Sequence, residues 1–522
     1  MTDPQPGPKS TWGLVGVWLA ASAVLTWRAS LTWSSLVDDA YISARYAEQM
    51  AKGNGLVYNA GQPAVEGYTN LSWTVLLAAG RVAGLPLVPL MTDLGWIFTL
   101  VAIGASIALM RAITGRSDLR VAIPALLLSL SPHVAVTATN GLESSLFLAV
   151  TLTALAAHLG LEGARRAWIA PILGLLVLTR PEGIVVASAV CAHDAWICRR
   201  TPGRAAPTWI GALGTFLLLE VWRHHTYGAW LPNTWYAKTS FPIAETFTRN
   251  KSYLQPEQAI LYTTLAAFGL GSITPPYSSK KALVIAITAL LGLIPLTVQE
   301  WMPGLRLYLP WMTLTAVLLA AFLVWLPRAA GLAFGAALCV GMAAYDVAAG
   351  DRVRTYDLRN TVLPHNGTQR AMEALAPKLK AGSWMATRDA GVAAYYIGMH
   401  VNVAELHDRA LTQPHPGGKD TDSLALTPVN PELFVSTLRT SDQAEFVYPN
   451  DRKVFKRLDA PYAYLGRVNQ HYRRHYDVYV RADLGVTDLP EDVVVSHAGP
   501  LPLPARPGAE PEAAAPREPT EP

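Results

Sequence analysis

The chain has 522 residues, of which 51% are hydrophobic and only 15% are charged, and its mean hydropathy is positive. This composition is too apolar for an ordinary soluble enzyme of two domains, and it indicates that much of the chain lies in a lipid bilayer. The net charge of +4 is small, and the basic residues form no stripe interleaved with aromatic residues. Composition therefore excludes nucleic-acid binding as the main function.

Apolar stretches in the first 350 residues predict a series of membrane-spanning helices. After a first span at 12–31, the segment 71–112 contains Arg81, Pro86 and Pro89 and predicts one crossing with a re-entrant or interfacial piece. Several later stretches approach the roughly 20 residues that cross a hydrocarbon core as a helix. These stretches lie at 120–131, 141–160, 208–221, 282–298, 307–327 and 329–344. Including shorter segments between them, we expect about eleven spans.

The basic residues of the short loops predict the orientation of these spans. If Lys9 is cytoplasmic, all the basic clusters of the later loops can also be cytoplasmic, as positively charged loops usually are. These clusters lie at 111–120, 165–166, 199–204 and 280–281, with Arg328 after them. The same orientation places a first loop at 34–70 and everything after about residue 350 outside.

Six short polar segments, from distant parts of the chain, fall on the external side under this orientation. They lie at or near span ends, and together they can build a cleft where lipid and water meet. The segments are DDAYISARYAEQM (38–50), VEGYTN (65–70), NGLES (140–144), RPEG (180–183), PNTWYAK (232–238) and EWMPGLR (300–306).

Asp38 and Asp39 directly follow the first span. Two neighbouring carboxylates against an apolar wall suit a base that takes a proton from a sugar hydroxyl. Asp38 lies closer to the span and is the favoured base, with Asp39 as its orienting partner. The pattern is equally compatible with Asp39 as a helix cap, with Arg45 on the polar face of the helix that follows.

The next two segments add further polar candidates. Glu66, Tyr68 and Asn70 precede the second span and suit either substrate binding or anchoring at the membrane interface. Arg180 and Glu182 interrupt an apolar run, where ionisable side chains are costly unless they pair or line a cavity. We therefore expect Arg180 and Glu182 to shape the site.

The last two segments supply cations at the membrane interface. PNTWYAK contributes Asn233, Tyr236 and Lys238, and Arg306 follows WMPG. A lysine or arginine there can form an ion pair with a phosphate, although contact with lipid headgroups is a common alternative. No cluster of histidine, cysteine and acidic residues predicts a metal site, so no cofactor is predicted; a divalent metal is compatible with the sequence but unsupported.

Taken in order, these segments resemble the glycosyltransferase C superfamily of polytopic membrane enzymes. The chain is similar to the terminal arabinofuranosyltransferase family of bacterial cell-wall assembly, and DDAYISARYAEQMAKGNGLVYNAGQPAVEGYTNLSWTVLLA (38–78) carries the most specific resemblance. NGLES, LTRPEG, PNTWYAK, WMPGLRLYLP and RDAGVAAYYIG resemble successive blocks of that family at similar spacing, so the resemblance covers residues 12–410.

The resemblance implies inverting transfer of a single sugar, which is arabinofuranose in the family that the chain resembles. The donor it implies is a polyprenyl-phosphate sugar, and the acceptor is a cell-envelope glycan or lipid. It implies that Asp38 or Asp39 is the base and that Lys238, Arg306 or Arg180 stabilises the leaving phosphate. We expect Glu300 to bind substrate as well. It departs from the family pattern, because relatives usually carry an aspartate at this position. The implied location is the bacterial cytoplasmic (inner) membrane, with a cytoplasmic N-terminus and an external, periplasmic C-terminal domain.

The C-terminal part predicts a small α/β domain. We place a transmembrane catalytic domain at 1–350, an external soluble domain at 351–490, and a disordered tail rich in proline, alanine and glutamate at 491–522. SWMAT, DAGVAAYYIG and HVNVAEL predict strand, helix and strand, and HYRRHYDVYVR (471–481) alternates like an exposed strand.

Two other functions remain open. A transporter or flippase for glycan lipids would more often show inverted repeats and ionisable residues at the membrane midplane, whereas these polar clusters gather at one face. An inactive relative that only binds glycan is the other alternative, and the DDAY and VEGYTN segments argue against it. Resemblance does not establish the sugar, because the shape of the pocket decides it.

Overall fold

The computed structural model describes most of the first 362 residues and parts of the rest of the chain. The described residues are 8–33, 36–238, 257–296, 303–362, 366–387, 390–405, 431, 433–440, 445–447, 462–471, 474–490 and 494–496. Two compact units divide the chain between Pro364 and His365.

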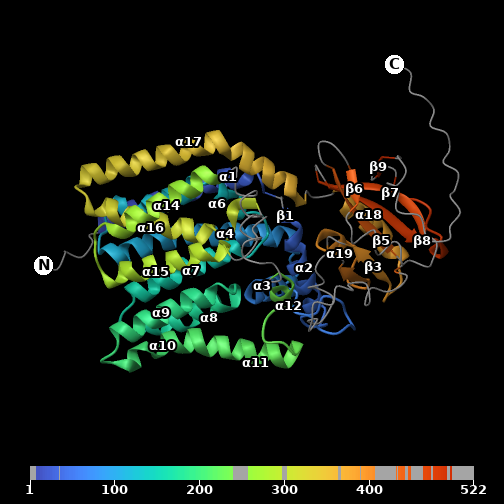
Figure 1. Cartoon of the computed structure of the whole chain (residues 1–522), viewed down its shortest axis with the longest axis horizontal. Coiled ribbons are helices and arrows are strands. Elements are labelled where there is room, and N and C mark those ends of the chain that lie inside the picture. Colours follow the sequence, from blue (N-terminus) through green and yellow to red (C-terminus); the bar gives the residue numbers. More distant parts are fainter. Residues whose placement is uncertain are drawn as a thin grey trace, which may run out of the picture. The chain divides into compact units, whose positions relative to one another are not determined.

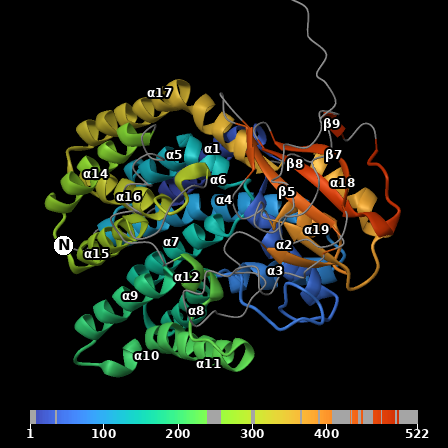
Figure 2. The same ribbon diagram turned by 45° about the vertical axis from the view of Figure 1, so that its right-hand side comes forward.

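The first unit is a bundle of helices (Figure 1). Its longer helices are α1 (Pro8–Ser30), α4 (Leu87–Thr114), α5 (Ile123–Leu130), α7 (Ser144–Gly160), α8 (Ile169–Thr179), α9 (Gly183–Ile197), α11 (Thr215–Tyr227), α14 (Gln258–Ile273), α15 (Ser279–Leu293), α16 (Leu309–Trp325) and α17 (Arg328–Asn360). Helix α7 is buried along nearly its whole length and packs closely against α4. Figure 2 shows α8, α9 and α11 on one side of α7, and α14, α16 and α17 on the other.

Several of these helices are long and apolar enough to cross a membrane. Among the described residues they are Trp12–Ser30, Leu87–Thr114, Gly203–Tyr227, Ser279–Leu296 and Arg328–Arg354, and shorter apolar helices of 10–17 residues accompany them. The segment 71–112 divides into α3 (Leu71–Val82), which is too short to span a bilayer, and the long helix α4. Helix α4 is long and apolar enough for the one predicted crossing, and the role of α3 as a re-entrant or interfacial piece stays a prediction.

Exposed tryptophans lie near both sets of helix ends. Trp12, Trp168, Trp196, Trp209 and Trp325 lie near the basic clusters, and Trp27, Trp230 and Trp235 lie near the opposite ends. Tryptophan is enriched at both interfaces of a membrane, so this distribution agrees with a bundle that spans a bilayer.

Short helices and a small ribbon gather at the opposite ends of the spans. They include α2 (Asp38–Ala51), α3, α6 (Pro132–Thr137) and α12 (Asn233–Lys238). Strand β1 (Leu36–Val37) pairs antiparallel with β2 (Thr361–Val362), and the backbone N–H of Val37 donates to the carbonyl of Asn140 at 3.1 Å. The start of α2 is therefore held by the segment after α17 and by the NGLES turn.

The second unit is a seven-stranded mixed sheet with two short helices. The strands lie in the order β4–β3–β5–β8–β7–β9, and β6 pairs with the C-terminal end of β5. The elements are α18 (Gly367–Leu375), β3 (Trp384–Thr387), α19 (Val392–Tyr396), β4 (Asn402–Glu405), β5 (Leu433–Thr440), β6 (Glu445–Val447), β7 (Tyr462–His471), β8 (Arg474–Arg481) and β9 (Val494–Ser496). Strands β3 and β4 are parallel and are connected through α19, so the predicted strand, helix and strand are confirmed.

Two expectations for this unit need correction. Strand β8 was expected to be exposed, but it pairs on both sides, with β5 and β7, and buries Tyr476 and Val478. Asp477 of the same strand is also buried, because its carboxylate accepts a 2.9 Å hydrogen bond from Arg467 on β7. Strand β9 lies within the segment predicted to be a disordered tail, and residues 497–522 of that tail lie outside the described part of the chain.

Candidate functional site

Asp38 and Asp39 form the first turn of α2, and both are half-buried. Val37 occupies the N-cap position, so neither aspartate is the capping residue that the sequence allowed as an alternative. Successive helical residues point about 100° apart, which places Asp39 within about 40° of Ser43 but Asp38 about 140° away from it. Asp39 therefore shares the helix face of Ser43.

Side chains from the rest of α2 form hydrogen bonds to the first loop. Arg45 is fully buried and donates from Nε to the carbonyl of Tyr58 at 2.9 Å and from Nη2 to Asn59 Oδ1 at 3.2 Å. Tyr46 donates its hydroxyl to the carbonyl of Val65 at 2.8 Å. Burial lowers the pKa of Arg45, although Tyr58 and Tyr46 act to raise it. Arg45 was predicted to bind substrate, and its described hydrogen bonds are to the first loop.

Glu66 and Tyr68 tie this loop to α11 and α12. The Glu66 carboxylate accepts a 2.6 Å hydrogen bond from Arg223 Nε, and its carbonyl accepts one from the backbone N–H of Asn233 at 3.0 Å. The hydroxyl groups of Tyr68 and Tyr227 are 3.0 Å apart. Burial raises the pKa of Glu66 to about 7, although the hydrogen bond and charge of Arg223 act to lower it.

A buried hydrogen-bonded network joins α2 to the ends of α7 and α8. Asn70 Nδ2 donates to Ser43 Oγ at 3.0 Å and to Glu143 Oε2 at 2.8 Å. The other oxygen of Glu143 accepts a hydrogen bond from Arg180 Nη1. Arg180 also donates from Nε and Nη2 to the two oxygens of Glu182, at 3.1 and 2.9 Å. This network brings together DDAYISARYAEQM, through Ser43, with VEGYTN, NGLES and RPEG, four of the six polar segments.

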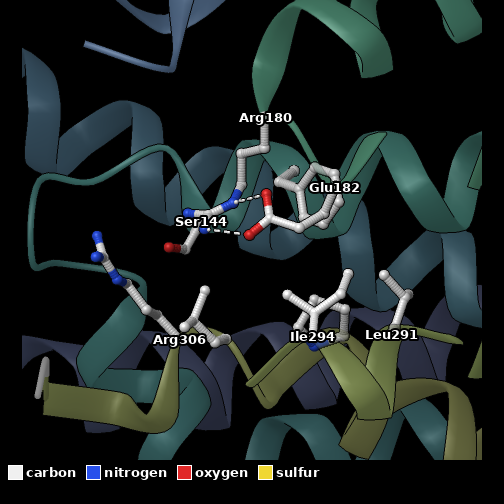
Figure 3. Close-up of a pocket in the computed structure, with 9 residues that line it drawn as sticks. Ser144, Arg180, Glu182, Leu291, Ile294 and Arg306 are labelled. Carbon is white, nitrogen blue, oxygen red and sulfur yellow. Dashed lines mark hydrogen bonds and ion pairs between the residues drawn. The ribbon is translucent and has the colours of Figure 1, made fainter. Parts of the chain in front are cut away.

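The network ends at a small pocket, shown in Figure 3. Arg180 and Glu182 lie on one side of it, Leu291 and Ile294 lie below them, and Arg306 extends beside Ser144. Burial acts to raise the pKa of Glu182, but Arg180, with a smaller contribution from Arg306, lowers the pKa overall. The lining residues are Ser144, Phe147, Arg180, Glu182, Leu291, Ile294, Arg306, Leu307 and Pro310.

A tight turn, Pro303–Leu305, immediately precedes Arg306 and places it at this pocket. Gly304 has φ 80°, and a Cβ at this position would lie 2.5 Å from Thr137 Oγ1 of α6, so only glycine fits. Leu305 also has a positive φ, 52°, and it is buried in a cluster with Ile260 and Trp311. Such strained backbone persists only where packing imposes it, and here it sets the position of Arg306.

The remaining predicted residues are placed only in part. Asn233 is buried at the start of α12, and Tyr236 is half-buried one turn later. The backbone of Lys238 ends α12, but its side chain lies outside the described residues, as does Glu300 entirely. Of the three predicted phosphate ligands, the structure brings Arg180 and Arg306 to one pocket.

Two central residues of this site, Glu143 and Arg223, were not predicted from the sequence. Glu143 lies in NGLES between two apolar runs, and the cost of an ionisable side chain in such a place would have selected it together with Arg180. Arg223 lies among polar residues near the end of an apolar helix, and no sequence signal linked it to Glu66. In the described part of the chain, no three histidine, cysteine or acidic side chains are grouped so as to hold a metal.

Comparison with known proteins gives one relative by sequence. No protein-family model matches the chain. The terminal β-(1→2)-arabinofuranosyltransferase of Mycobacterium tuberculosis is 31% identical over 146 residues, which are 26% of this chain and 23% of the relative. The chain thus matches about a quarter of the length of this curated relative.

Solved structures match a much larger part of the chain. ArnT from Cupriavidus metallidurans bound to undecaprenyl phosphate superposes with a TM-score of 0.56 at 15% identity, over 94% of this chain and 99% of ArnT. The arabinofuranosyltransferase AftD from Mycobacteria gives a TM-score of 0.54 at 15% identity, over 89% of this chain and 40% of AftD. At such identities the agreement concerns the fold, and it extends over both units. The chain is therefore a multi-pass membrane protein with the glycosyltransferase C fold of ArnT and AftD.

Proposed function

We propose that this protein is an inverting membrane glycosyltransferase, which transfers a single sugar from a polyprenyl-phosphate donor to a cell-envelope glycan or lipid acceptor. The observation that carries the proposal is the pocket beside the Asn70–Glu143–Arg180 network. One wall is charged, and the other is formed by Phe147, Leu291, Ile294, Leu307 and Pro310. A polyprenyl phosphate has the same two parts, an anionic group and an apolar chain.

The relatives support this class of donor. ArnT, which shares the fold over nearly its whole length, was solved bound to undecaprenyl phosphate. The sequence relative and AftD are both arabinofuranosyltransferases, which makes arabinofuranose the first sugar to test.

Within the pocket, we assign Arg306 to the donor phosphate. Arg180 donates to both Glu143 and Glu182, so two carboxylates offset its single charge. Arg306 lines the same pocket from a separate turn, and its planar guanidinium suits a phosphate. We assign Lys238, at the end of α12, as a second cation for the leaving phosphate.

Asp38 and Asp39 are the candidates for the base. One carboxylate accepts the proton of the acceptor hydroxyl while the hydroxyl oxygen forms a bond to the anomeric carbon. The bond from that carbon to the phosphate oxygen breaks, and its electron pair leaves with the polyprenyl phosphate, so the configuration is inverted. Helix α2 belongs to the same network as the pocket, through Ser43 and Asn70.

The other predicted residues divide into two groups in this proposal. Arg45, Glu66, Tyr68 and Asn70 shape the first loop around the acceptor, because their described contacts are to other parts of the protein. Tyr236, Asn233 and Glu300 are assigned to substrate binding at the rim. We further propose about eleven spans, a cytoplasmic N-terminus and an external soluble domain.

The test is turnover by the purified protein in lipid. A panel of polyprenyl-phosphate sugars, beginning with arabinofuranose, is incubated with the protein and candidate acceptors, and release of polyprenyl phosphate is measured. We expect release with at least one donor and none with the Asp38→Asn, Asp39→Asn double variant. Movement of an intact labelled donor across sealed vesicles, without release, would instead establish a flippase.

A further inference from the structure

Glu143 of the NGLES turn is a buried carboxylate with both oxygens engaged. It immediately precedes α7, and only 4% of its surface is exposed. Oε2 accepts a 2.8 Å hydrogen bond from Asn70, and Oε1 accepts one from Arg180. A carboxylate in such a place is costly unless its partners are fixed, so its position depends on these two contacts.

These contacts join the two halves of the proposed site. Asn70 ends the first loop and also contacts Ser43, which lies one helical turn after Asp39 on the same face of α2. Arg180 ends α8 and lines the pocket. The backbone follows the same path, because Gly141 of the NGLES turn approaches α2 so closely that an added Cβ would lie 2.9 Å from the Cβ of Ala40.

The charges around Arg180 also require Glu143. Glu143 and Glu182 are two negative charges flanking one positive charge, and all three side chains are at most 15% exposed. Arg306 lines the same pocket and contributes to the lowered pKa of Glu182. Removing the charge of Glu143 therefore makes the surroundings of the pocket more positive and removes one of the two carboxylates that hold Arg180.

We propose that Glu143 is a positioning residue of the transfer reaction, which sets the distance between the aspartates of α2 and the donor pocket. This inference rests on the proposed glycosyltransferase function. Glu143 contacts neither substrate in this assignment. It acts through Asn70 on the acceptor side and through Arg180 on the donor side.

The kinetic constants of Glu143→Gln separate this role from phosphate binding. The glutamine keeps the size and one acceptor oxygen but loses the charge that holds Arg180. We expect kcat to fall about 10²-fold, the loss typical of a misplaced reacting group. The KM for the donor should stay the same or decrease, since the pocket becomes more positive. A phosphate ligand such as Arg306 would show the opposite pattern, with weaker donor binding.

A double-mutant cycle tests the connection itself. Asn70→Ala removes the amide that contacts Glu143 without changing any charge, and its kcat should also fall. The two losses should not multiply in the double variant, because both changes break one network. Glu48→Gln is the matched control, since Glu48 lies on the same helix α2 but pairs with Arg81, at 2.7 Å, outside the network. Its kcat should equal that of the wild type, and its effect should combine independently with Glu143→Gln.

The outcomes separate this inference from the function on which it rests. Wild-type turnover together with a normal kcat in Glu143→Gln, or with independent effects of Glu143→Gln and Asn70→Ala, overturns the positioning role alone. Absence of wild-type turnover with every donor overturns both. If Glu143→Gln does not fold, as judged by thermal unfolding in lipid, Asn70→Ala decides: an unchanged kcat rejects the role, and a reduced kcat with unchanged donor KM supports it.

Discussion

At the scale of single residues, the site consists of charged side chains whose partners differ in kind. Arg180 is enclosed by Glu143 and Glu182, whereas Arg306 reaches the pocket from a separate, strained turn. The two aspartates of α2 also differ, since only Asp39 shares the face of Ser43. Chemically similar residues therefore receive different roles from their surroundings.

The proposed base predicts a loss of turnover without a loss of donor binding. Asparagine preserves the shape of an aspartate but cannot accept the proton, so the variant that removes the base should lose roughly 10²- to 10⁴-fold in kcat. Asp38→Asn and Asp39→Asn are measured separately, each with donor affinity as the control. Near-normal turnover in both folded variants would contradict the mechanism.

The proposed phosphate ligands predict the complementary pattern. Arg306→Met or Lys238→Met should weaken donor binding by about 2 to 5 kcal/mol if the lost charge is desolvated in the complex. The exposed Arg116, which follows the C-terminal end of α4, provides the control, since Arg116→Met should bind the donor normally. If donor affinity is unchanged in both variants, these cations contact lipid headgroups instead.

At the scale of elements, the first loop is held to its neighbours by buried polar contacts. Glu66 joins it to α11 through Arg223, which also pairs with Glu220 of α11. Tyr68 adds a contact to Tyr227 of the same helix. The first loop is therefore tied to α11 by side-chain contacts, although it contains little regular structure.

The Glu66 contact predicts a pH dependence of stability. Its pKa is about 7 in the folded protein, because of burial, and 4.5 is its ordinary value. The folded state therefore holds a proton that the unfolded state releases between about pH 4.5 and 7, and the free energy of unfolding falls as the pH rises through this range. Unfolding midpoints measured in detergent against pH should decrease in the wild type.

The control for this dependence is Glu66→Gln, which cannot titrate. Its midpoint should change less between pH 4.5 and 7 than that of the wild type. An equal change in both proteins would assign the pH dependence to other groups.

At the scale of the whole molecule, the two ends of the helix bundle carry different side chains. The basic clusters lie near one set of helix ends, and the network with its pocket lies at the other. Which end faces the cell exterior follows from the positive-inside tendency and is open to direct measurement.

Cysteine labelling in sealed cells measures the orientation. In a background with Cys191, Cys198 and Cys339 replaced, Lys52→Cys in the first loop should react with a membrane-impermeant reagent from outside. Arg200→Cys, in a basic cluster, should react only after permeabilisation. Both positions are exposed, so accessibility is not limited by folding. The reverse pattern would invert the proposed topology.

The sequence by itself determined the membrane class, the strand–helix–strand start of the second unit, and the six polar segments. These features depend on local composition and periodicity, which can be recognised without contacts. Only the tertiary structure decided that Glu143 joins Asn70 to Arg180, that Arg223 pairs with Glu66, and that β8 is central in its sheet. These are contacts between segments far apart in the chain, and whether a buried charge finds its partner depends on packing that no local pattern records.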